Sequence, residues 1–210
     1  GMAQTVVANT IVDTVEELTF EEYAQSLTEA YKAEGVEIEV IRPQEDITFT
    51  ADMLEDDLAN VESISKQIKQ ASSENIEIDE FDYNSSVYYP TAMYGTLTLS
   101  KEDTVFDNLL PAAVLSCTVK VTANIKVELN NNRIMSGGKP SLDVTRAIGY
   151  DDYVDYKSHT VSIDNSPSKA KNRTIKYSIN CVLKQEASLG AVSAWAKVDK
   201  NIAVTMKPFS

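Results

Sequence analysis

Residues 113–129, AVLSCTVKVTANIKVEL, alternate apolar and polar side chains along almost their whole length. In an extended chain every second side chain points to the same face, so this stretch predicts a long strand with one buried face. The side chains expected to point inward are Leu115, Cys117, Val119, Val121, Ala123, Ile125, Val127 and Leu129. A strand of this length either bends from one sheet into another or carries a β-bulge.

The same period recurs through the rest of the C-terminal half. Further strands are expected near residues 93–99, 141–148, 153–164, 174–184, 191–197 and 200–206, with turns at the Asn run 130–132 and the glycines 137–138. Many strands in succession predict an antiparallel β-sandwich of six to eight strands within residues 90–210. An immunoglobulin-like sandwich fits this spacing, although Trp195 follows both cysteines instead of lying between them.

The N-terminal part follows a helical period instead. Residues 20–34 carry one apolar stripe, which the Thr19 and Glu22 capping box opens and Gly35 closes. A strand with one charged face is expected at residues 36–40.

A second helix is expected at residues 51–70, capped by Thr50. The chain then divides into a flexible lead (1–14), an acidic helix–strand–helix segment with an irregular connector (15–89) and the β-sandwich. The predicted fold class is therefore α+β.

Charge changes at the same boundary. Residues 1–90 carry 21 acidic and 4 basic side chains, a net charge of −17, whereas residues 91–210 carry 11 and 15, a net charge of +4. Many of the acids lie in the first turns of the predicted helices, where the helix dipole favours negative charge. The basic run in residues 169–176 is either a solvated turn or faces the acidic half.

The two cysteines, Cys117 and Cys181, both fall on inward positions of predicted strands. One interpretation is a disulfide between two core strands, as in proteins of oxidising compartments. The other is a pair of buried free thiols that behave as small hydrophobic side chains.

Four segments of the C-terminal part resemble the C-terminal β domain of secreted Gram-positive proteins of unknown function. They are TVKVTAN (118–124), DYVDYKSH (152–159), TIKYSIN (174–180) and NIAVTM (201–206). The resemblance is one of pattern over about residues 90–210. It implies a β fold and an extracellular or cell-envelope location, and it implies no activity.

Aromatic and acidic side chains alternate just before and within one predicted strand. They are Tyr150, Asp151, Asp152, Tyr153, Asp155 and Tyr156. Aromatic rings stack on the apolar faces of sugars while carboxylates accept hydrogen bonds from sugar hydroxyls, so this cluster is a candidate ligand site. In the alternative, the rings pack on the sandwich and the carboxylates are solvated.

The connector holds a second candidate site. Asp79, Asp82 and Asn84 offer oxygen ligands of the kind that calcium prefers, although the EF-hand pattern with its central Gly and terminal Glu is missing. The alternative is a solvated acidic linker.

No catalytic residue or cofactor site is predicted. His159 is the single histidine, and neither a nucleophile elbow nor a glycine-rich turn lies beside it. The net charge of −13 argues against nucleic acid as a partner. No apolar run approaches the roughly 18–20 residues that cross a bilayer.

These observations predict a non-enzymatic secreted or cell-envelope module that binds a protein or a glycan. The polar lead at residues 3–10 looks like the start of a chain from which an export signal has been removed. Two alternatives stay open. One is a carboxylate-based glycan hydrolase or other extracellular enzyme, and the other is a cytoplasmic structural protein.

Overall fold

The computed structural model describes residues 16–72, 76–78, 85–88, 93–105, 117–146 and 152–210 and confirms the mixed α+β class. The helices are α1 (Phe20–Ala33), α2 (Ala51–Leu58) and α3 (Val61–Ser72). The strands are β1 (Glu17–Leu18), β2 (Glu37–Ile41), β3 (Phe49–Thr50), β4 (Ile76–Ile78), β5 (Ser85–Tyr88), β6 (Tyr94–Val105), β7 (Cys117–Glu128), β8 (Arg133–Gly137), β9 (Ser141–Arg146), β10 (Asp152–Asp164), β11 (Thr174–Ser188) and β12 (Ser193–Met206). Among the described residues every strand pair is antiparallel except β4 with β12.

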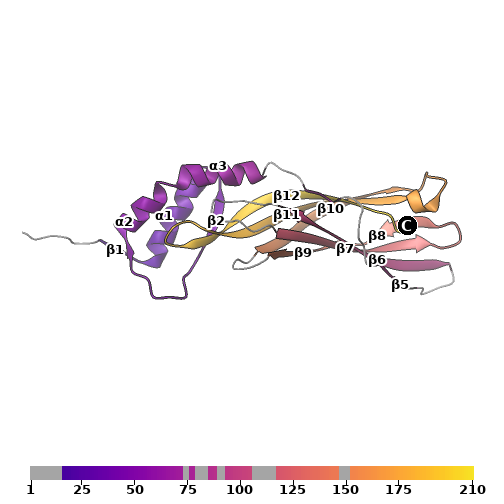
Figure 1. Ribbon diagram of the computed structural model, residues 1–210, viewed down its shortest axis with the longest axis horizontal. Coiled ribbons are helices and arrows are strands. Elements are labelled where there is room, and N and C mark those ends of the chain that lie inside the picture. The colour runs from indigo at the N-terminus through magenta and orange to yellow at the C-terminus, as the bar shows by residue number, and fades with distance from the viewer. Residues whose placement is uncertain (1–15, 73–75, 79–84, 89–92, 106–116, 147–151) are drawn as a thin grey trace, which may run out of the picture.

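The molecule is elongated, with the helices at one end and the C-terminus at the other (Figure 1). The hairpin of β11 and β12 runs between these two ends. Its turn lies at the helical end, and its open end lies near the C-terminus. This hairpin is therefore the element that connects the two parts of the molecule.

Two five-stranded sheets make up most of the fold. Sheet I has the order β10-β11-β12-β2, and β4 also pairs with β12. Sheet II has the order β5-β6-β7-β8, and β9 also pairs with β7. Both β2 and β4 precede residue 90, so backbone hydrogen bonds join the N-terminal segment to the C-terminal strands.

Strands β11 and β12 alternate strictly between buried and partly exposed side chains. The buried set consists of the odd positions 175–187 of β11 and the even positions 194–206 of β12. One continuous face of the hairpin is therefore buried from end to end, and the opposite face is the outer face of sheet I.

Two different layers cover this buried face. Near the open end it packs on sheet II in the inter-sheet cluster: Ile78, Leu97, Leu99, Val119, Val121, Ala123, Ile125, Val127, Ile134, Ile175, Tyr177, Ile179, Cys181, Ile202, Val204 and Met206. Near the turn it packs on the helices in the helical cluster: Tyr23, Leu27, Tyr31, Val36, Ile38, Phe49, Val61, Ile68, Ala187, Leu189, Val192, Ala194, Ala196 and Val198. The same strands thus contribute to both cores.

Gly137 of sheet II lies close against Tyr177 of sheet I. A Cβ atom at this position would overlap the hydroxyl group of Tyr177. The missing side chain lets the buried tyrosine reach across, and its hydroxyl donates to the carbonyl oxygen of Gly138 at 2.8 Å. The glycine pair predicted as a turn signal therefore also has a packing role.

The structure confirms the first predicted helix and both of its end signals. The Thr19 hydroxyl accepts from the backbone N–H of Glu22 at 3.1 Å, and the Glu22 carboxylate accepts from the backbone N–H of Thr19 at 2.9 Å. Gly35 ends the helix with a φ of 80°. The predicted apolar stripe is buried against sheet I through Tyr23, Leu27 and Tyr31.

The prediction of one helix over residues 51–70 is wrong, because the structure has two helices there, α2 and α3. The break falls at Ala59 and Asn60, where the Asn60 amide donates to the Asp56 carbonyl oxygen at 3.4 Å. A side chain that bonds the local backbone weakens a continuing helix. The break lets α2 direct Asp57 onto the β11–β12 turn.

The described strands match most of the prediction. The main differences concern β12, the connector and β7, and β8 (Arg133–Gly137) forms where no strand was expected. The expected pair of strands at 191–197 and 200–206 is a single strand, because the alternation continues through Asp199 and Lys200. Asp199 faces outward, where its carboxylate lies 3.6 Å from the Lys157 ammonium group, and Lys200 is buried. The predicted irregular connector contains β4 and β5. Strand β7 stays within sheet II, and its register with β6 and β9 is continuous. The shift in its pairing with β8 leaves the extra residue, Met135, on β8, so the prediction that this long strand bends between sheets or carries a bulge is wrong for Cys117–Glu128.

The basic residues 169–176 do not face the acidic helices. Lys169, Lys171 and Arg173 lie in the connection between β10 and β11, which includes the short 3₁₀ helix Ala170–Asn172, and Lys176 lies at the start of β11. This region is at the end of the molecule opposite to the helices (Figure 1). The solvated-turn interpretation of this run is the one that the structure supports.

The predicted disulfide is not formed at Cys181. This residue is a free, buried cysteine of β11, and burial raises the pKa of its thiol to about 11. Cys117 begins β7 in sheet II, and its side chain lies outside the described residues, as does the whole predicted lead 1–14. At Cys181 the structure therefore corresponds to the interpretation of a small buried side chain.

None of the helices in the described part of the chain has the length and apolar character of a membrane span.

Candidate functional site

The outer face of sheet I carries aromatic and charged side chains at its helical end. Strand register places them in two neighbouring rows. One row runs across the strands as Tyr153, Lys184, Lys197 and Glu37, and the next as Glu186, Trp195 and Glu39. Side chains in such rows lie close enough to interact, so this end of the face is a continuous surface.

Tyr153 and Trp195 form an aromatic pair on this surface. Their ring centroids are 5.5 Å apart and their planes meet at 87°, an edge-to-face arrangement. The pair spans three strands, because Tyr153 belongs to β10 and Trp195 to β12. Tyr153 is 49% exposed, which is unusual for a large aromatic side chain and leaves its ring available to a ligand.

A groove of about 520 Å³ lies beside this pair. We call it the aromatic groove, and its described lining residues are Ile41, Arg42, Pro43, Gln44, Tyr153, Glu186, Gly190, Ala191, Val192, Ser193 and Trp195. The end of β2 and the following segment form one wall, and the β11–β12 turn forms another. A volume of this size suits a small molecule or one or two sugar rings.

A buried carboxylate fixes the turn that forms this second wall. Asp57 of α2 is 6% exposed and accepts hydrogen bonds from the backbone N–H of Ala191 at 3.0 Å and from the hydroxyl of Tyr23. A Cβ atom at Gly190, where φ is 113°, would overlap this carboxylate. The groove wall is therefore held by the helical layer and is preorganised.

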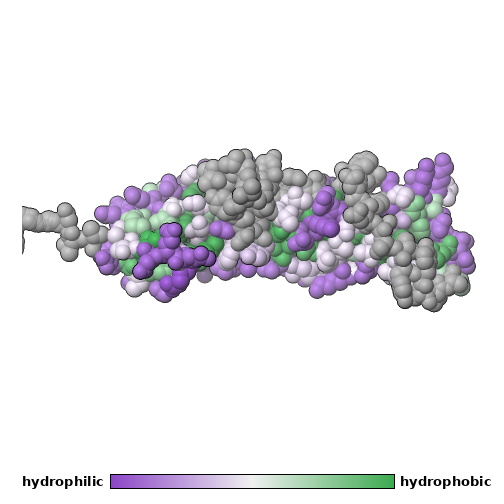
Figure 2. Space-filling view, turned by 60° about the horizontal axis from the view of Figure 1, so that its bottom comes forward, coloured by the Kyte–Doolittle hydropathy of each residue, from purple (hydrophilic) through white to green (hydrophobic). Residues whose placement is uncertain are grey.

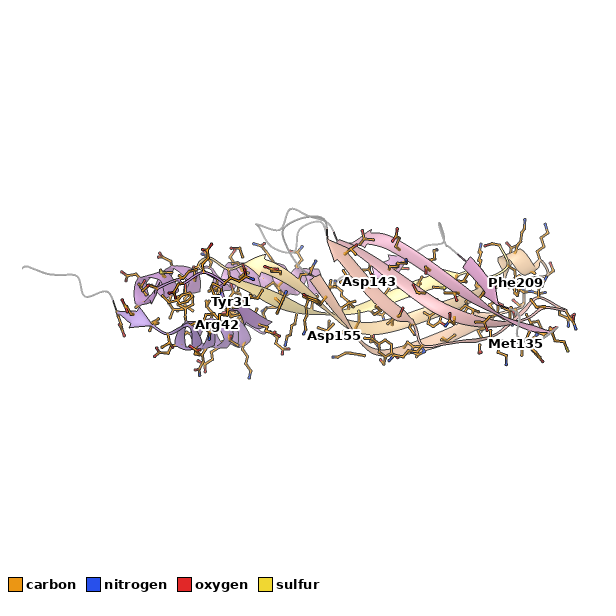
Figure 3. All side chains as sticks on the ribbon, turned by 90° about the horizontal axis from the view of Figure 1, so that it is seen from below. Tyr31, Arg42, Met135, Asp143, Asp155 and Phe209 are labelled. Atoms are coloured by element: carbon orange, nitrogen blue, oxygen red, sulfur yellow. The ribbon has the colours of Figure 1, made fainter. Side chains whose placement is uncertain are left out.

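Arg42 stands at the opposite wall. Its guanidinium forms an ion pair with Glu21 and lies 4.4 Å from the centroid of the Phe20 ring. Backbone and Arg42 hydrogen bonds lower the pKa of Glu21, so that this acid stays ionised. These contacts tie the segment after β2 to the start of α1 (Figure 3 labels Arg42 at this end of the molecule).

The groove combines apolar ring surface with a few polar groups. The indole Nε1 of Trp195 is shielded from solvent and has no hydrogen-bond partner within the described part of the chain. Glu186 is the one carboxylate among the described lining residues, while Gln44 and Ser193 add an amide and a hydroxyl. The groove therefore offers stacking together with hydrogen bonding, and its described lining residues include no facing pair of carboxylates.

The structure separates the residues of the predicted ligand cluster. Tyr153 faces outward into the groove, and the Asp155 carboxylate faces outward beside the Lys184 ammonium group at 3.4 Å. Tyr156 lies on the inner face, because residues an odd number of positions apart in a strand point to opposite faces. Asp152 begins β10, and Tyr150 and Asp151 lie outside the described residues.

Tyr156 has a structural environment instead. Its ring packs against the inter-sheet cluster, and the Lys139 ammonium group lies 4.4 Å from the ring centroid. Its hydroxyl shares a hydrogen bond of 2.6 Å with Nδ1 of His159, whose ring is 5.9 Å from that of Tyr177. The single histidine is thus a half-buried member of an aromatic group.

The predicted calcium ligands Asp79, Asp82 and Asn84 lie outside the described residues. Within the described part, no group of three or more His, Cys, Asp or Glu side chains is placed to hold a metal ion.

Sequence reasoning missed most of the groove, including Trp195, Glu186 and Arg42. One signal was available for Trp195, because it occupies an outward position in the alternating stretch 193–206 among polar neighbours. A large aromatic side chain on the polar face of a strand is unexpected in a purely structural surface. Its partner Tyr153 could not be identified, because the pairing of β10 with β11 is a tertiary property.

Comparisons with known proteins assign no function to the chain. No family model and no curated protein matches its sequence. A comparison of structures matches the chain with a crystal structure of a two-domain protein with unknown function from Bacteroides thetaiotaomicron. That likeness has 16% sequence identity and a TM-score of 0.32, and it covers 79% of this chain and 72% of the other.

Proposed function

We propose that the protein is a non-enzymatic binding module that holds a glycan in the aromatic groove. The observation that carries the proposal is the exposed ring of Tyr153, which stands perpendicular to the half-buried ring of Trp195 at the wall of a preformed groove. Sugar rings have apolar faces that stack on aromatic rings and hydroxyl groups that need hydrogen-bond partners. The groove offers both kinds of contact.

Its dimensions favour a glycan over a protein partner. Stable protein interfaces bury about 800 Å² on each partner around an apolar centre. Here the aromatic surface is limited to two rings, and the charged rows of Lys184, Lys197, Glu37 and Glu39 surround it. In the space-filling view hydrophilic residues also dominate much of the helical end, with only small hydrophobic patches between them (Figure 2).

The same features favour binding over hydrolysis. A carboxylate-based glycosidase uses two facing acids, one of which has a raised pKa. The groove has Glu186 alone among its described lining residues. A second cavity of about 480 Å³ on the other side of residues 42–44 is lined by four exposed acids, Glu17, Glu21, Glu45 and Asp46, and the pKa of Glu21 is lowered.

Two further parts of the proposal concern fold and location. The inter-sheet cluster draws its members from sheets I and II, which supports a β-sandwich as the finer description of the β part. The sequence resemblance of residues 90–210 to secreted Gram-positive proteins supports a place outside the cell or at the cell envelope. Detecting the full-length protein in fractionated cells of its source organism tests the location.

The binding proposal is tested with a panel of soluble polysaccharides: β-glucan, xylan, mannan, starch, pectin and chitin fragments. We expect the protein to bind at least one of them in calorimetry. Replacing Tyr153 or Trp195 with alanine should weaken that binding by about tenfold or more, because each ring supplies stacking area.

Tyr94→Ala is the matched control, since Tyr94 is a half-buried aromatic residue of sheet II whose ring lies 5.1 Å from the Lys126 ammonium group. It should leave binding unchanged. A panel with no binder, or equal affinities for Tyr153→Ala and the unmodified protein, would refute the proposal. Release of reducing sugars from a bound polysaccharide would identify a hydrolase instead.

A further inference from the structure

The outer face of sheet I continues beyond the aromatic groove and changes its chemistry. Close to the groove it carries the ion pairs of Lys184 with Asp155 and of Lys197 with Glu37 and Glu39. Beyond a further ion pair of Lys157 with Asp199, the outward positions in the next two rows of β10, β11 and β12 are uncharged: Ser158, Thr160, Ser178, Asn180, Asn201 and Ala203. In Figure 3 Arg42 marks the groove end, and Asp155 lies further toward the middle of the molecule.

Four of these residues form one hydrogen-bonded group, which we call the amide network: Ser158, Ser178, Asn180 and Asn201. The Asn201 amide donates to the Ser178 hydroxyl and to the Asn180 carbonyl oxygen, both at 3.0 Å. The Asn180 amide in turn donates to the Ser158 hydroxyl at 3.2 Å. Because these bonds fix the orientation of both amides, the network is preorganised.

The network has hydrogen-bonding capacity left over. Asn201 uses its amide hydrogens within the network, so its Oδ1 atom is an acceptor, and no described residue donates to it. The hydroxyls of Ser158 and Ser178 accept from the amides and can still donate. Asn180 and Ser158 are exposed, and Ser178 and Asn201 are half-buried. An uncharged, exposed array of donors and acceptors matches the hydroxyl groups of a sugar.

The network and the groove lie on one line. Trp195 and Asn201 are both outward residues of β12 and are six positions apart, which corresponds to about 20 Å along a strand. Glu186 and Asn180 are separated by the same number of positions on β11, and the strand between them is unbroken. This distance exceeds what one or two sugar rings in the groove would cover.

We infer that the ligand is an extended polysaccharide chain, which stacks in the aromatic groove and runs along β11 and β12 to the amide network as a second binding subsite. This inference rests on the proposed function, because the groove anchors the chain. It assigns recognition of the polysaccharide's hydroxyl groups to Asn180 and Asn201. A glycan too short to reach both subsites should bind through the groove alone.

The experiment compares oligosaccharides of increasing length, cut from the polysaccharide that binds in the panel. Calorimetry would measure the affinity of the disaccharide, tetrasaccharide and octasaccharide for the unmodified protein and for Asn201→Ala, Asn180→Ala and Tyr153→Ala. We expect Asn201→Ala to weaken binding of the octasaccharide by about tenfold and to leave the disaccharide unaffected. Tyr153→Ala should weaken binding at every length.

Asn172→Ala is the matched control, because Asn172 is an exposed residue of the β10–β11 connection, away from this face. Asn201→Ser, which keeps a polar group, replaces Asn201→Ala if that variant lowers the melting temperature. Equal affinities of Asn201→Ala and the unmodified protein for the octasaccharide would overturn the inference, while the proposed binding of a glycan in the groove would still stand. Unchanged binding by Tyr153→Ala would instead overturn the proposed function.

Discussion

At the scale of single residues, the groove depends on contacts that reach it from the helical layer. Asp57 is buried and receives hydrogen bonds from Tyr23 and from the backbone of Ala191, so one carboxylate joins α1, α2 and the β11–β12 turn. The turn accepts this carboxylate because residue 190 has no side chain. A change at either position should therefore affect stability and groove geometry together.

Gly190→Ala should destabilise the protein more than Gly35→Ala. Both glycines have a positive φ, which costs a non-glycine residue roughly 1–2 kcal/mol. At Gly35 a Cβ atom would meet only the flexible end of Lys69, whereas at Gly190 it would overlap Asp57. Urea unfolding should show a free-energy loss for Gly190→Ala that is larger by at least about 1 kcal/mol. Equal losses would contradict this account of the turn.

Two buried tyrosines should respond differently to the removal of their hydroxyl groups. Tyr177→Phe loses the hydrogen bond to Gly138 and should cost about 1 kcal/mol of unfolding free energy. Tyr31→Phe should be neutral or stabilising, because no described residue accepts from the buried Tyr31 hydroxyl. Denaturant unfolding at pH 7 measures both, and a large loss for Tyr31→Phe would indicate a partner for that hydroxyl.

The raised pKa values of these two tyrosines also predict how the stability changes at alkaline pH. Burial raises the pKa of Tyr31 and Tyr177 from 10.0 to about 12, so the folded state favours their protonated forms. The resulting stabilisation is complete below pH 10 and is lost as the pH rises toward 12. Unfolding free energies measured between pH 9 and 12 should fall, and the double variant with phenylalanine at both positions should show a shallower fall.

The Cys181 thiol should be protected in the folded protein. It is 2% exposed, and its raised pKa of about 11 leaves little reactive thiolate at pH 8. A thiol reagent should modify it only after unfolding in urea without a reductant, as peptide mass mapping would show. A Cys181 that stays unmodified until a reductant is added would establish the disulfide that the sequence suggested.

At the scale of elements, the decisive feature is that one face of the β11–β12 hairpin is buried along its full length while the other carries the site. Neighbouring residues of β12 therefore have opposite environments. Ala196 is 2% exposed and belongs to the helical cluster, and Lys197 points outward to Glu37 and Glu39. This alternation is the reason that groove and core can occupy the same two strands.

Glutamine placed at these two neighbouring positions tests the alternation. Ala196→Gln puts a larger polar side chain into a packed core and should cost roughly 2–4 kcal/mol. Lys197→Gln removes ion pairs to exposed carboxylates and should cost less than about 1 kcal/mol. Chemical unfolding of the two variants gives the comparison, and a reversed order would mean that the register of β12 is different.

At the scale of the whole molecule, the charge boundary near residue 90 is not a structural boundary. Strands β2 and β4 of the acidic half pair with β12, and Lys197 forms ion pairs with Glu37 and Glu39 of β2. The lysines of residues 169–176 lie at the far end. The two halves are joined by strand pairing and by shared cores. Attraction between the basic run and the helices does not contribute to this association.

The shared hairpin predicts that the two halves unfold together. Helical circular dichroism, which follows the helical end, and hydrogen exchange of peptides from β6 and β7, which follows sheet II, should give coincident transitions in urea. Leu27→Ala in the helical cluster and Ile125→Ala in the inter-sheet cluster should each lower both midpoints. Two separate transitions, or a midpoint shift confined to one probe, would show that the halves are independent domains.

Local patterns in the sequence determined the elements but not their assembly. Helix α1, its capping box, the alternation of β7 and the α+β class could all be predicted, because they depend on side chains a few positions apart. The break between α2 and α3 and the continuity of β12 could not, because each depends on contacts with other elements. Tyr153 was predicted as a ligand residue and lines the groove, but Asp155 pairs with Lys184 and Tyr156 packs on the inner face.

The long alternating stretch around β7 by itself determined a strand with one buried face, and the structure places that face in the inter-sheet cluster. Only the tertiary structure decided what lies beside each strand. The groove brings together residues 41–44, Tyr153, Glu186 and Trp195, which are far apart in the sequence, through the pairing of β10, β11, β12 and β2. Periodicity specifies which face a side chain occupies, whereas register between strands specifies its neighbours, and register is set by packing across the whole fold.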